Sequence, residues 1–374
     1  MNTGQQLWVE NRTTPTGATG WGLMGPVGNG IYTEYDKGAR QWVGYNVKTG
    51  KKIWGPSEAY TNPWASLPTN DFFALIAYDT FYSFTVDGIH AHDIETGERL
   101  WDFYGAPAGA DFPGYSNLPF ENNMLYTIAD EKVIASTGDS HGVPQYRGAR
   151  LYVVDAFNGT EVWSVGGYYQ GTMPVADGHL VAFNAYDNQI YCFGKGQTAT
   201  TVSALLKVSV HGDSILIEGT VTDQSAGETC LGVPAAGTPA IADDSMSDWM
   251  EYFYMQQMEP DNATGVEVVL ETLDPNGNFY EIGRTTSDAG GMYSYAFTPE
   301  VPGLYTIFAT FEGSESYYSS RAETAINVEE APQASPTPTP PPPGMTDTYV
   351  IGFGSAALIA IIVVGAILIL LRRR

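Results

Sequence analysis

The chain has 374 residues and carries 42 acidic against 17 basic side chains, a net charge of −25 at neutral pH. This shortage of Lys and Arg disfavours nucleic acid as a partner, because phosphate binding depends on clustered positive charge. The length predicts two or three domains. A solvated acidic surface, favoured over an acidic binding patch, is the simplest interpretation of the charge.

A short phrase ending in tryptophan recurs along the first half of the chain. Its copies TGQQLW, TGKKIW, TGERLW and NGTEVW end at Trp8, Trp54, Trp101 and Trp163. Each copy contains a glycine that provides the positive φ of a tight turn between two strands. These glycines are Gly4, Gly50, Gly97 and Gly159. Intervals of about 40 to 50 residues are typical of four-stranded propeller blades, and each tryptophan ring is expected to pack on the neighbouring copy.

Two departures interrupt this repeat. The third interval is longer, and the Gly, Pro and polar residues of 136–148 predict a surface loop inserted there. A weaker fifth copy spans 178–193. In it, Asp187-Asn188 is interpreted as replacing the Thr-Gly turn, and Phe193 as standing in place of the tryptophan.

The spacing of aspartate, Thr-Gly and tryptophan resembles the pyrroloquinoline-quinone-like (PQQ-like) repeat of β-propellers, over roughly Thr3 to Gly196. That family includes quinoprotein alcohol dehydrogenases and non-catalytic scaffold propellers such as the outer-membrane assembly lipoprotein. The resemblance implies a propeller fold. It does not imply a bound quinone, because family members with this repeat often bind none.

The first copy, at residues 3–8, corresponds to the last strand of a blade whose earlier strands are absent from the sequence. Propellers close with about four to eight blades. We therefore expect the chain to be the C-terminal part of a longer propeller. The alternative is that a tail strand and four blades close by sharing one blade between the two ends. Residues 1–15 lack the basic start and apolar run of a signal peptide.

A second domain is expected over 198–330. Seven strand-like runs separated by turn residues predict a β-sandwich, and the stretch 286–314 resembles immunoglobulin-like (Ig-like) surface domains of archaea and bacteria. An insertion near 243–257 has apolar residues at helical spacing. It predicts a short helix packed on the sandwich, in preference to a partner-binding helix, with Ser245 or Asp244 as its N-cap.

The last part of the chain predicts a membrane anchor. Residues 349–371 carry no charge, and as a helix of about 34 Å they would cross a bilayer core of about 30 Å. The arginines at 372–374 favour a cytoplasmic C-terminus with the rest of the chain outside. Residues 331–348 contain a Pro- and Thr-rich tract that predicts an extended stalk. The combination of stalk, span and arginines resembles archaeal cell-surface proteins.

The expected fold class is therefore all-β, with a partial or small PQQ-like β-propeller, an Ig-like β-sandwich and a single C-terminal transmembrane helix. The predicted segments are propeller repeats over 1–197, the sandwich over 198–330, the stalk over 331–348, the transmembrane helix over 349–371 and a cytoplasmic tail over 372–374.

Candidate chemistry is sparse. His90 and His92 lie two apart in one predicted strand, so their side chains share a face and are weak candidates for metal ligation. In the repeat alignment they occupy ordinary blade positions. Asn46, Asp93 and Asp155 precede the turns and are expected to hydrogen-bond the local backbone. No catalytic or cofactor-binding residue is predicted.

The cysteines and the glycosylation sequons concern the question of whether the folded domains lie outside the cell. Cys192 and Cys230 would be able to pair outside the cell, and two separate thiols are the alternative. Three sequons predict glycosylation at Asn11, Asn158 and Asn262. Asn158 lies in a blade turn that is expected to face solvent.

Two functions remain open at this point. The first is a non-catalytic, membrane-anchored cell-surface protein whose propeller and sandwich bind or organise other surface proteins or glycans. The alternative is a membrane-tethered quinoprotein oxidoreductase using PQQ and calcium, with part of its site in missing N-terminal blades. The resemblance implies that such an enzyme has calcium-binding carboxylates, a catalytic aspartate and often an adjacent cysteine pair. Since the sequence has no adjacent cysteines, the first function is favoured and no cofactor is predicted.

Overall fold

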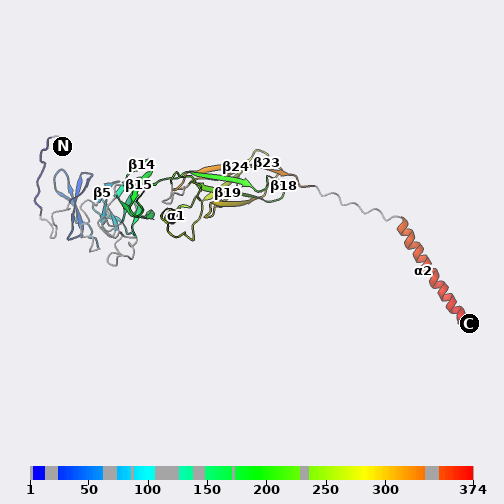
Figure 1. Ribbon diagram of the computed structural model, residues 1–374. Coiled ribbons are helices and arrows are strands. Elements are labelled where there is room, and N and C mark those ends of the chain that lie inside the picture. Colours follow the sequence, from blue (N-terminus) through cyan, green and yellow to red (C-terminus); the bar gives the residue numbers. More distant parts are fainter. Residues whose placement is uncertain are drawn as a thin grey trace. The chain divides into compact units, whose positions relative to one another are not determined.

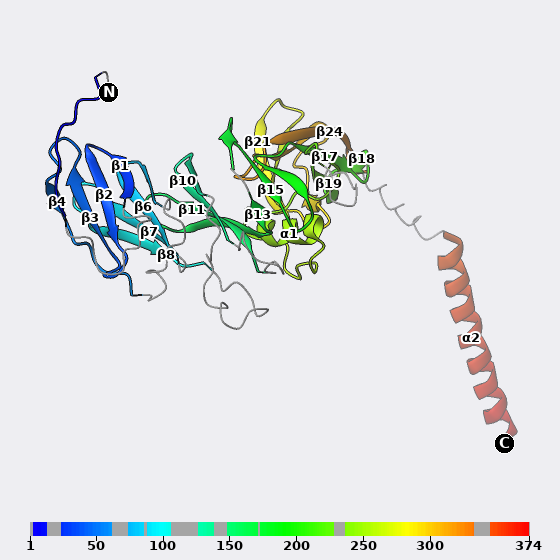
Figure 2. The same cartoon turned by 60° about the vertical axis from the view of Figure 1, so that its left-hand side comes forward.

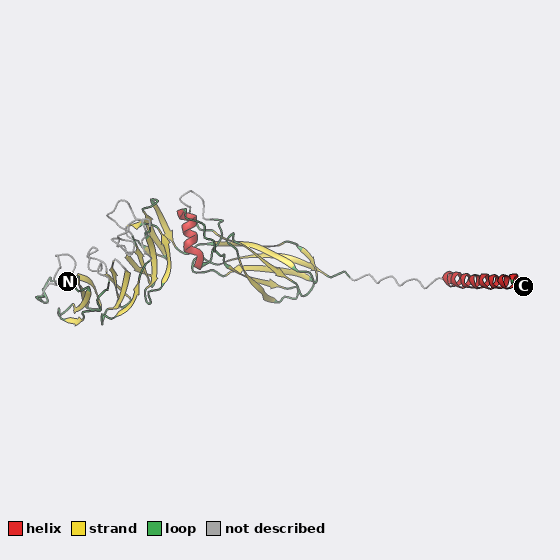
Figure 3. Ribbon diagram, turned by 90° about the horizontal axis from the view of Figure 1, so that it is seen from below, coloured by secondary structure: helices red, strands yellow, loops and turns green. Residues whose placement is uncertain are grey.

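The computed structural model describes residues 3–12, 24–61, 74–85, 88–105, 126–137, 148–170, 173–227, 236–332 and 345–373 (Figure 1). Strands are the main secondary structure of this part of the chain, and its two helices are red in Figure 3. The expected all-β class with one C-terminal apolar helix is confirmed. The chain divides into two compact units, Met1–Val328 and Glu329–Arg374, which are described separately.

Four small antiparallel sheets follow one another in the first half of the chain, and we call them blades 1 to 4. Blades 1 to 3 each have four strands paired in chain order, as the repeat predicts. Blade 1 contains β1 (Met24–Gly28), β2 (Ile31–Asp36), β3 (Gln41–Asn46) and β4 (Lys52–Trp54). Blade 2 contains β5 (Ala74–Ala77), β6 (Thr80–Thr85), β7 (Gly88–Asp93) and β8 (Arg99–Phe103). Blade 3 contains β9 (Tyr126–Ala129), β10 (Lys132–Ser136), β11 (Arg150–Asp155) and β12 (Glu161–Gly166).

Neighbouring blades share apolar cores, which is why their strands lie side by side in Figure 2. One core joins blades 1 and 2, another joins blades 2 and 3, and a third joins blades 3 and 4. These cores contain, respectively, Trp42 with Phe81, Ile89 with Val133, and Val153 with Leu180. Each blade is thus stabilised by the burial of its faces against the next one in the chain.

The first hairpin of every blade closes with two residues that both have positive φ. The four turns are Asn29-Gly30, Tyr78-Asp79, Asp130-Glu131 and Asp177-Gly178. This is the type I′ geometry that matches the twist of paired strands, and Asn-Gly and Asp-Gly are its preferred residues. Two of these turns, Tyr78-Asp79 and Asp130-Glu131, lack glycine, and their residues make hydrogen bonds between neighbouring blades. The Asn29 amide donates to the Asp79 carboxylate (2.9 Å), and the Glu131 N–H donates to the Tyr78 hydroxyl (3.0 Å).

The second hairpin of blades 1 to 3 contains the recurrent Asn or Asp and glycine. As predicted, Asn46, Asp93 and Asp155 accept hydrogen bonds from backbone N–H groups two and three residues later. The glycines that follow have φ between about 70° and 75°, so they occupy the left-handed region that favours glycine. The residues that stabilise each turn lie within the turn itself, so these turns can be predicted from the sequence.

Each of three repeat tryptophans fastens one copy of the phrase to the turn of the next blade. The indole N–H groups of Trp8, Trp54 and Trp101 donate to the carbonyls of Val47, Ile94 and Ala156, at 2.8, 2.8 and 3.2 Å. Each carbonyl belongs to the third residue before a turn glycine. The rings lie so close to Gly50, Gly97 and Gly159 that a Cβ there would come within 2.3 to 2.7 Å of an indole carbon. Glycine is therefore required both for φ and for the close approach of the ring, and the expected packing on the neighbouring copy is confirmed.

Blade 4 departs from this pattern. It contains β13 (Tyr169–Gln170), β14 (Val175–Ala176), β15 (His179–Asn184) and β16 (Gln189–Phe193). Both short strands pair with β15, so the blade has three strand positions and the described residues provide no outer strand beyond β16.

The interpretation of the fifth copy of the phrase was therefore wrong. The Asp187-Asn188 pair closes the hairpin between β15 and β16, which are the second and third strand positions of blade 4. It does not replace the Thr-Gly turn, and Phe193 ends the third position rather than the fourth. Both kinds of turn use Asp or Asn before a residue with positive φ, which is 61° at Asn188, so sequence spacing alone confuses them.

A β-sandwich follows, built from two antiparallel sheets. The smaller sheet has the order β17-β19-β22 and the larger β18-β24-β23-β20-β21. The bounds are β17 (Thr198–Ala204), β18 (Val208–Val210), β19 (Ile215–Asp223), β20 (Glu267–Leu273), β21 (Phe279–Thr286), β22 (Met292–Phe297), β23 (Gly303–Phe311) and β24 (Ser320–Glu329). Alternate residues of both sheets face inward and form one core, which includes Ile217, Leu270 and Tyr305.

The predicted short helix is present as α1 (Asp243–Met255). Its predicted N-cap was wrong, because Ala242 occupies that position and makes no side-chain capping bond. The nearby polar side chains have other partners. Asp243 accepts hydrogen bonds from the backbone of residues 315 and 316, and Ser245 accepts one from the Thr264 N–H.

Helix α1 packs on the blades as well as on the sandwich. Met246 contacts the sandwich core, whereas Met250 and Met255 contact the core shared by blades 3 and 4. The Glu251 carboxylate accepts hydrogen bonds from the Arg150 guanidinium (2.7 Å) and the Gly166 N–H (2.8 Å). The two halves of the first unit are thereby joined by both apolar and charged contacts.

The second unit contains α2 (Met345–Arg372), whose stretch from Thr348 to Arg372 has a mean hydropathy of 2.9. None of its most apolar window is buried against the protein. Its length and composition suffice to cross a membrane. Most of the predicted stalk, residues 333–344, lies outside the described residues, as does 138–147 of the predicted surface loop.

Candidate functional site

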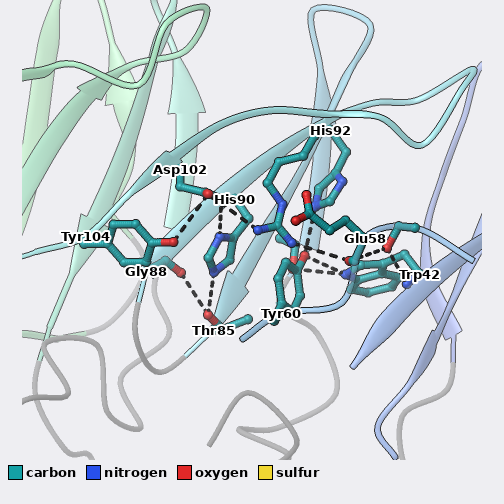
Figure 4. A network of polar contacts seen from close by, with 12 residues as sticks. Trp42, Glu58, Tyr60, Thr85, Gly88, His90, His92, Asp102 and Tyr104 are labelled. Carbon is teal, nitrogen blue, oxygen red and sulfur yellow. Dashed lines mark hydrogen bonds and ion pairs between the residues drawn. The ribbon is translucent and has the colours of Figure 1, made fainter. Parts of the chain in front are cut away.

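A network of polar side chains at one end of blade 2 is the candidate site (Figure 4). His90 and His92 alternate along β7 and lie on the same face of blade 2, where both rings contact the ring of Tyr60. Both histidines are almost completely buried, with exposed fractions of 1% and 0%. The prediction that these two side chains share a face is therefore confirmed.

His90 lies between a hydroxyl and a carboxylate. Its Nδ1 is 2.6 Å from Asp102 Oδ1, and its Nε2 is 2.8 Å from Thr85 Oγ1. Because a carboxylate accepts, His90 Nδ1–H is the donor to Asp102. The second carboxylate oxygen accepts from Tyr104 (3.3 Å) and lies 3.5 Å from Arg99.

This set of partners controls the charge of Asp102. Burial alone would raise the pKa of its carboxyl group. The hydrogen bond and charge of His90, the charge of Arg99 and the Tyr104 hydroxyl together outweigh burial and hold the pKa below its ordinary value. Asp102 is therefore ionised at neutral pH.

His92 belongs to the second arm of the network. Its Nδ1 lies 3.3 Å from the Gly97 carbonyl, which only accepts, so Nδ1 carries the proton. Its Nε2 then accepts from the Tyr60 hydroxyl at 2.9 Å, and the Trp42 indole N–H donates to the same hydroxyl at 3.0 Å. Burial lowers the pKa of His92 to about 4, against a small opposing effect of the Gly97 carbonyl. His92 is neutral under physiological conditions.

Tyr60 connects the two arms. Its ring stacks on His90 with centroids 4.4 Å apart, and the Arg99 guanidinium carbon lies 4.7 Å from the centre of the Tyr60 ring. Burial raises the pKa of the Tyr60 phenol. Because Tyr60 comes from the segment after β4, the network joins blade 1 to blade 2.

The arrangement does not fit a metal ion. All four ring nitrogens of His90 and His92 have hydrogen-bond partners within the protein. Across the described ranges, no group of three or more His, Cys, Asp or Glu side chains is placed to hold a metal. We derive no quinone chemistry from this chain.

Hydroxyl, imidazole and carboxylate in sequence form the order that activates nucleophiles in enzymes. Here Thr85 is 8% exposed and His90 is 1% exposed. The geometry accounts directly for a structural role, since buried polar groups are costly unless hydrogen-bonded. We therefore interpret the network as structural. Its hydrogen bonds satisfy the buried polar groups at the end of blade 2 where β6 connects to β7.

The remaining predicted residues lie apart from the network. Asn11, Asn158 and Asn262 are all exposed, and the Asn158 side chain accepts from Thr160 in a blade turn. Cys192 is exposed on β16. Cys230 lies outside the described residues, so the pairing of the two cysteines stays a prediction.

Sequence reasoning missed Tyr60, Thr85, Arg99 and Asp102 as members of this network. Asp102 was detectable, because it directly follows a repeat tryptophan and the corresponding residues of the other three copies are Val9, Gly55 and Ser164. A carboxylate that occurs in one copy of the repeat alone indicates a hydrogen-bonding or charged partner specific to that blade. Tyr60 lies between strands and had no comparable signal.

Comparisons with known proteins add little to this picture. No family model matches the chain, and no curated protein does. Among solved structures it is similar to BamB from Moraxella catarrhalis, with 13% identity over 74% of this chain and 84% of that one and a TM-score of 0.30. Streptogramin B lyase shows 7% identity over 75% and 93% of the two chains, with a TM-score of 0.28. Fibronectin(III)-like modules of Clostridium thermocellum CbhA show 13% identity over 48% and 78%, with a TM-score of 0.22.

Likenesses of this size concern the fold alone and carry no argument about function. The sheets themselves define a propeller-like all-β fold. The PQQ-like and Ig-like assignments stay predictions.

Proposed function

We propose that the protein is a single-pass membrane protein that presents its blades and sandwich at the cell surface, where they bind or organise other surface proteins or glycans. The observation that carries the proposal is α2. None of its most apolar window is buried, and residues such as Ile362 and Leu368 are more than half exposed. A helix with this composition is stable in a bilayer and costly in water.

The orientation follows from the arginines after the span. Clustered positive charge favours the cytoplasmic side, so the proposal places the C-terminus inside and the folded domains outside. The three exposed sequon asparagines at 11, 158 and 262 are compatible with an external location.

The binding or scaffold role is supported by what the repeated residues do. Within the described chain, the recurrent Gly and Asp or Asn residues form turns, and Trp8, Trp54 and Trp101 join neighbouring blades. Their partners are protein groups, and the buried histidines likewise serve the blade interior. The proposed partners are proteins or glycans. The net charge of −25 disfavours nucleic acid.

Fractionation of membranes tests the anchoring. Full-length protein is expected to require detergent for release, whereas a chain lacking residues 345–374 is expected in the soluble fraction. A variant with Gly352, Gly354 and Gly365 changed to Ala is the matched control, because it alters α2 without adding polarity and should stay in the membrane. Release of the full-length chain by salt or alkaline wash would contradict the proposal.

A further inference from the structure

The outer face of the larger sheet of the sandwich has two halves of different polarity. Side chains alternate along each strand, so those that do not enter the sandwich core point outward. We call the end of this sheet where β24 ends the stalk end, because the predicted stalk follows β24 in the chain. β20 also ends there, and β21 and β23 begin there.

Ion pairs occupy the half that lies away from the stalk end. Arg284 on β21 lies 2.8 Å from Glu267 on β20 and 3.0 Å from Glu281 on its own strand. Arg321 on β24 lies 3.7 Å from Glu271 on β20. All five side chains are at least partly exposed. Because these charges are paired and solvated, this half of the face is stable in water.

The other half of the face, at the stalk end, contains large apolar side chains. Strand pairing places Phe279 opposite Leu273, and Leu273 opposite Thr306. Leu304 comes two residues before Thr306 on β23, so it is a diagonal neighbour of Leu273, at about 7–8 Å. Phe279 is 53% exposed and Leu304 is 62% exposed. These side chains therefore form one exposed apolar row across three strands.

The row continues over the remaining two strands of the sheet. Leu304 pairs with Asn327 on β24, whose N–H donates to the Lys207 carbonyl at 2.9 Å. The next residue, Val208 on β18, is exposed, whereas Ser209 after it is buried, so Val208 points outward. We call this set the uncharged half, and its outward residues are Phe279, Leu273, Thr306, Leu304, Ala325, Asn327 and Val208.

A contiguous exposed apolar patch of this kind marks an interaction surface. The turns beside it carry the carboxylates of Asp213, Asp274 and Glu300, which outnumber the basic Lys207. If the stalk end entered a layer of lipid headgroups, these carboxylates would meet phosphate groups of the same sign. The uncharged half itself brings no charge into a contact. It therefore fits a flat, uncharged protein face better than it fits a lipid surface.

We propose that the uncharged half packs against the same half of a second copy anchored in the same membrane. This inference rests on the anchoring proposed above. Copies anchored by α2 share one orientation, so a two-fold axis along the membrane normal can bring identical faces together. Residues 330–344 separate β24 from α2 in every copy, so the tether keeps the uncharged halves within similar distances of the bilayer.

The common anchoring explains how so small a face can hold two copies together. A stable interface between free proteins uses about 20–30 residues a side, several times the size of the uncharged half. Attachment to one membrane raises the effective concentration of each face for the other, so a weak contact is sufficient. The contact buries the apolar row and leaves the ion pairs of the other half in water, which avoids the cost of desolvating charges.

Crosslinking in membranes tests the proposal. In a full-length chain with Cys192 and Cys230 changed to Ser, the substitution Asn327→Cys adds a thiol to the uncharged half and keeps every apolar side chain. A short thiol crosslinker is expected to give a covalent dimer. Met292→Cys is the matched control, because Met292 is exposed and its neighbour Tyr293 enters the core, which places Met292 on the outer face of the smaller sheet. This control should stay monomeric.

A charge placed in the uncharged half tests whether the apolar row makes the contact. In the Asn327→Cys chain, Leu304→Asp should lower the crosslinked fraction at least about tenfold, because an unpaired carboxylate would be buried between the copies. Met292→Asp should leave the fraction unchanged. Circular dichroism and membrane fractionation of each variant check that the chain is folded and anchored.

Three outcomes would overturn the proposal. Equal crosslinking of the Asn327→Cys and Met292→Cys chains, or an undiminished dimer in Leu304→Asp, would do so while the chain stays in the membrane fraction and the anchoring stands. A chain that is absent from the membrane fraction would overturn the anchoring and this inference together.

A polarity-sensitive dye on the Asn327→Cys chain distinguishes a second copy from lipid. In vesicles that hold one copy each, the emission should be that of a dye in water. It should shift to that of an apolar environment as the number of copies per vesicle increases. An apolar emission already present with one copy per vesicle would mean that lipid covers the uncharged half, and would contradict the proposal.

Discussion

Substitution of Gly97 by Ala tests the contact that joins the blades. A Cβ built on Gly97 would lie 2.3 Å from an indole carbon of Trp54, and the backbone there has a φ of +75°. Trp54 is 7% exposed and donates to the Ile94 carbonyl at 2.8 Å. The added methyl group must therefore displace a buried ring and break this hydrogen bond.

The expected cost has three parts. An alanine with positive φ costs about 1–2 kcal/mol, and loss of the indole hydrogen bond adds about 0.5–1.5 kcal/mol. Partial exposure of the Trp54 ring adds a fraction of the ~3 kcal/mol that full burial of such a side chain contributes. Gly97→Ala is thus expected to lower the free energy of unfolding by about 3–5 kcal/mol.

Gly30→Ala isolates the contribution of the contact. Gly30 has nearly the same φ, +74°, but a Cβ there would meet no atom within 4 Å, so this variant should lose only the ~1–2 kcal/mol of backbone strain. Urea unfolding of the detergent-solubilised protein, followed by circular dichroism, measures both. A double-mutant cycle with Trp54→Ala should show coupling, because Gly97→Ala costs less once the ring is gone. Equal costs at the two glycines, or strict additivity in the cycle, would refute the reasoning.

Two further predictions concern the buried His92 and the half-buried Glu251. Because the pKa of His92 falls from 6.5 to about 4 on folding, the unfolded state binds a proton first as pH decreases. Stability should therefore be constant above pH 6.5 and fall by at most ~3 kcal/mol as pH drops towards 4, with a flatter profile in His92→Gln measured by urea titration at each pH. Glu251→Gln weakens the bonds to Arg150 and Gly166 and should lower the free energy of unfolding by about 1–2 kcal/mol. The exposed Glu259→Gln should be neutral, and equal losses would argue against the contact.

The sequence predicted the blades because their signals are local. An Asn or Asp such as Asn46 caps its own turn, a glycine such as Gly50 supplies the required φ, and a tryptophan follows at a fixed distance. The membrane span is equally local, since 23 uncharged residues need no tertiary information. These features were readable without the structure.

The features that the sequence did not predict depend on contacts between segments that are distant in the chain. Asp187-Asn188 was assigned to the wrong hairpin, because two turns of a blade share one chemistry and only strand pairing distinguishes them. Helix α1 was expected on the sandwich alone, but Met250 and Glu251 contact the blades as well. The network around His90 requires Tyr60, which comes from a segment between two blades.

Labelling from outside intact cells tests the central claim of outward presentation most directly. Met258→Cys, at a position that is 91% exposed, and Arg373→Cys, after the span, are each placed in a chain without native cysteines. A membrane-impermeant maleimide should label Cys at position 258 in intact cells and at position 373 only after permeabilisation. The reverse pattern, or labelling of both positions only after permeabilisation, would contradict the account.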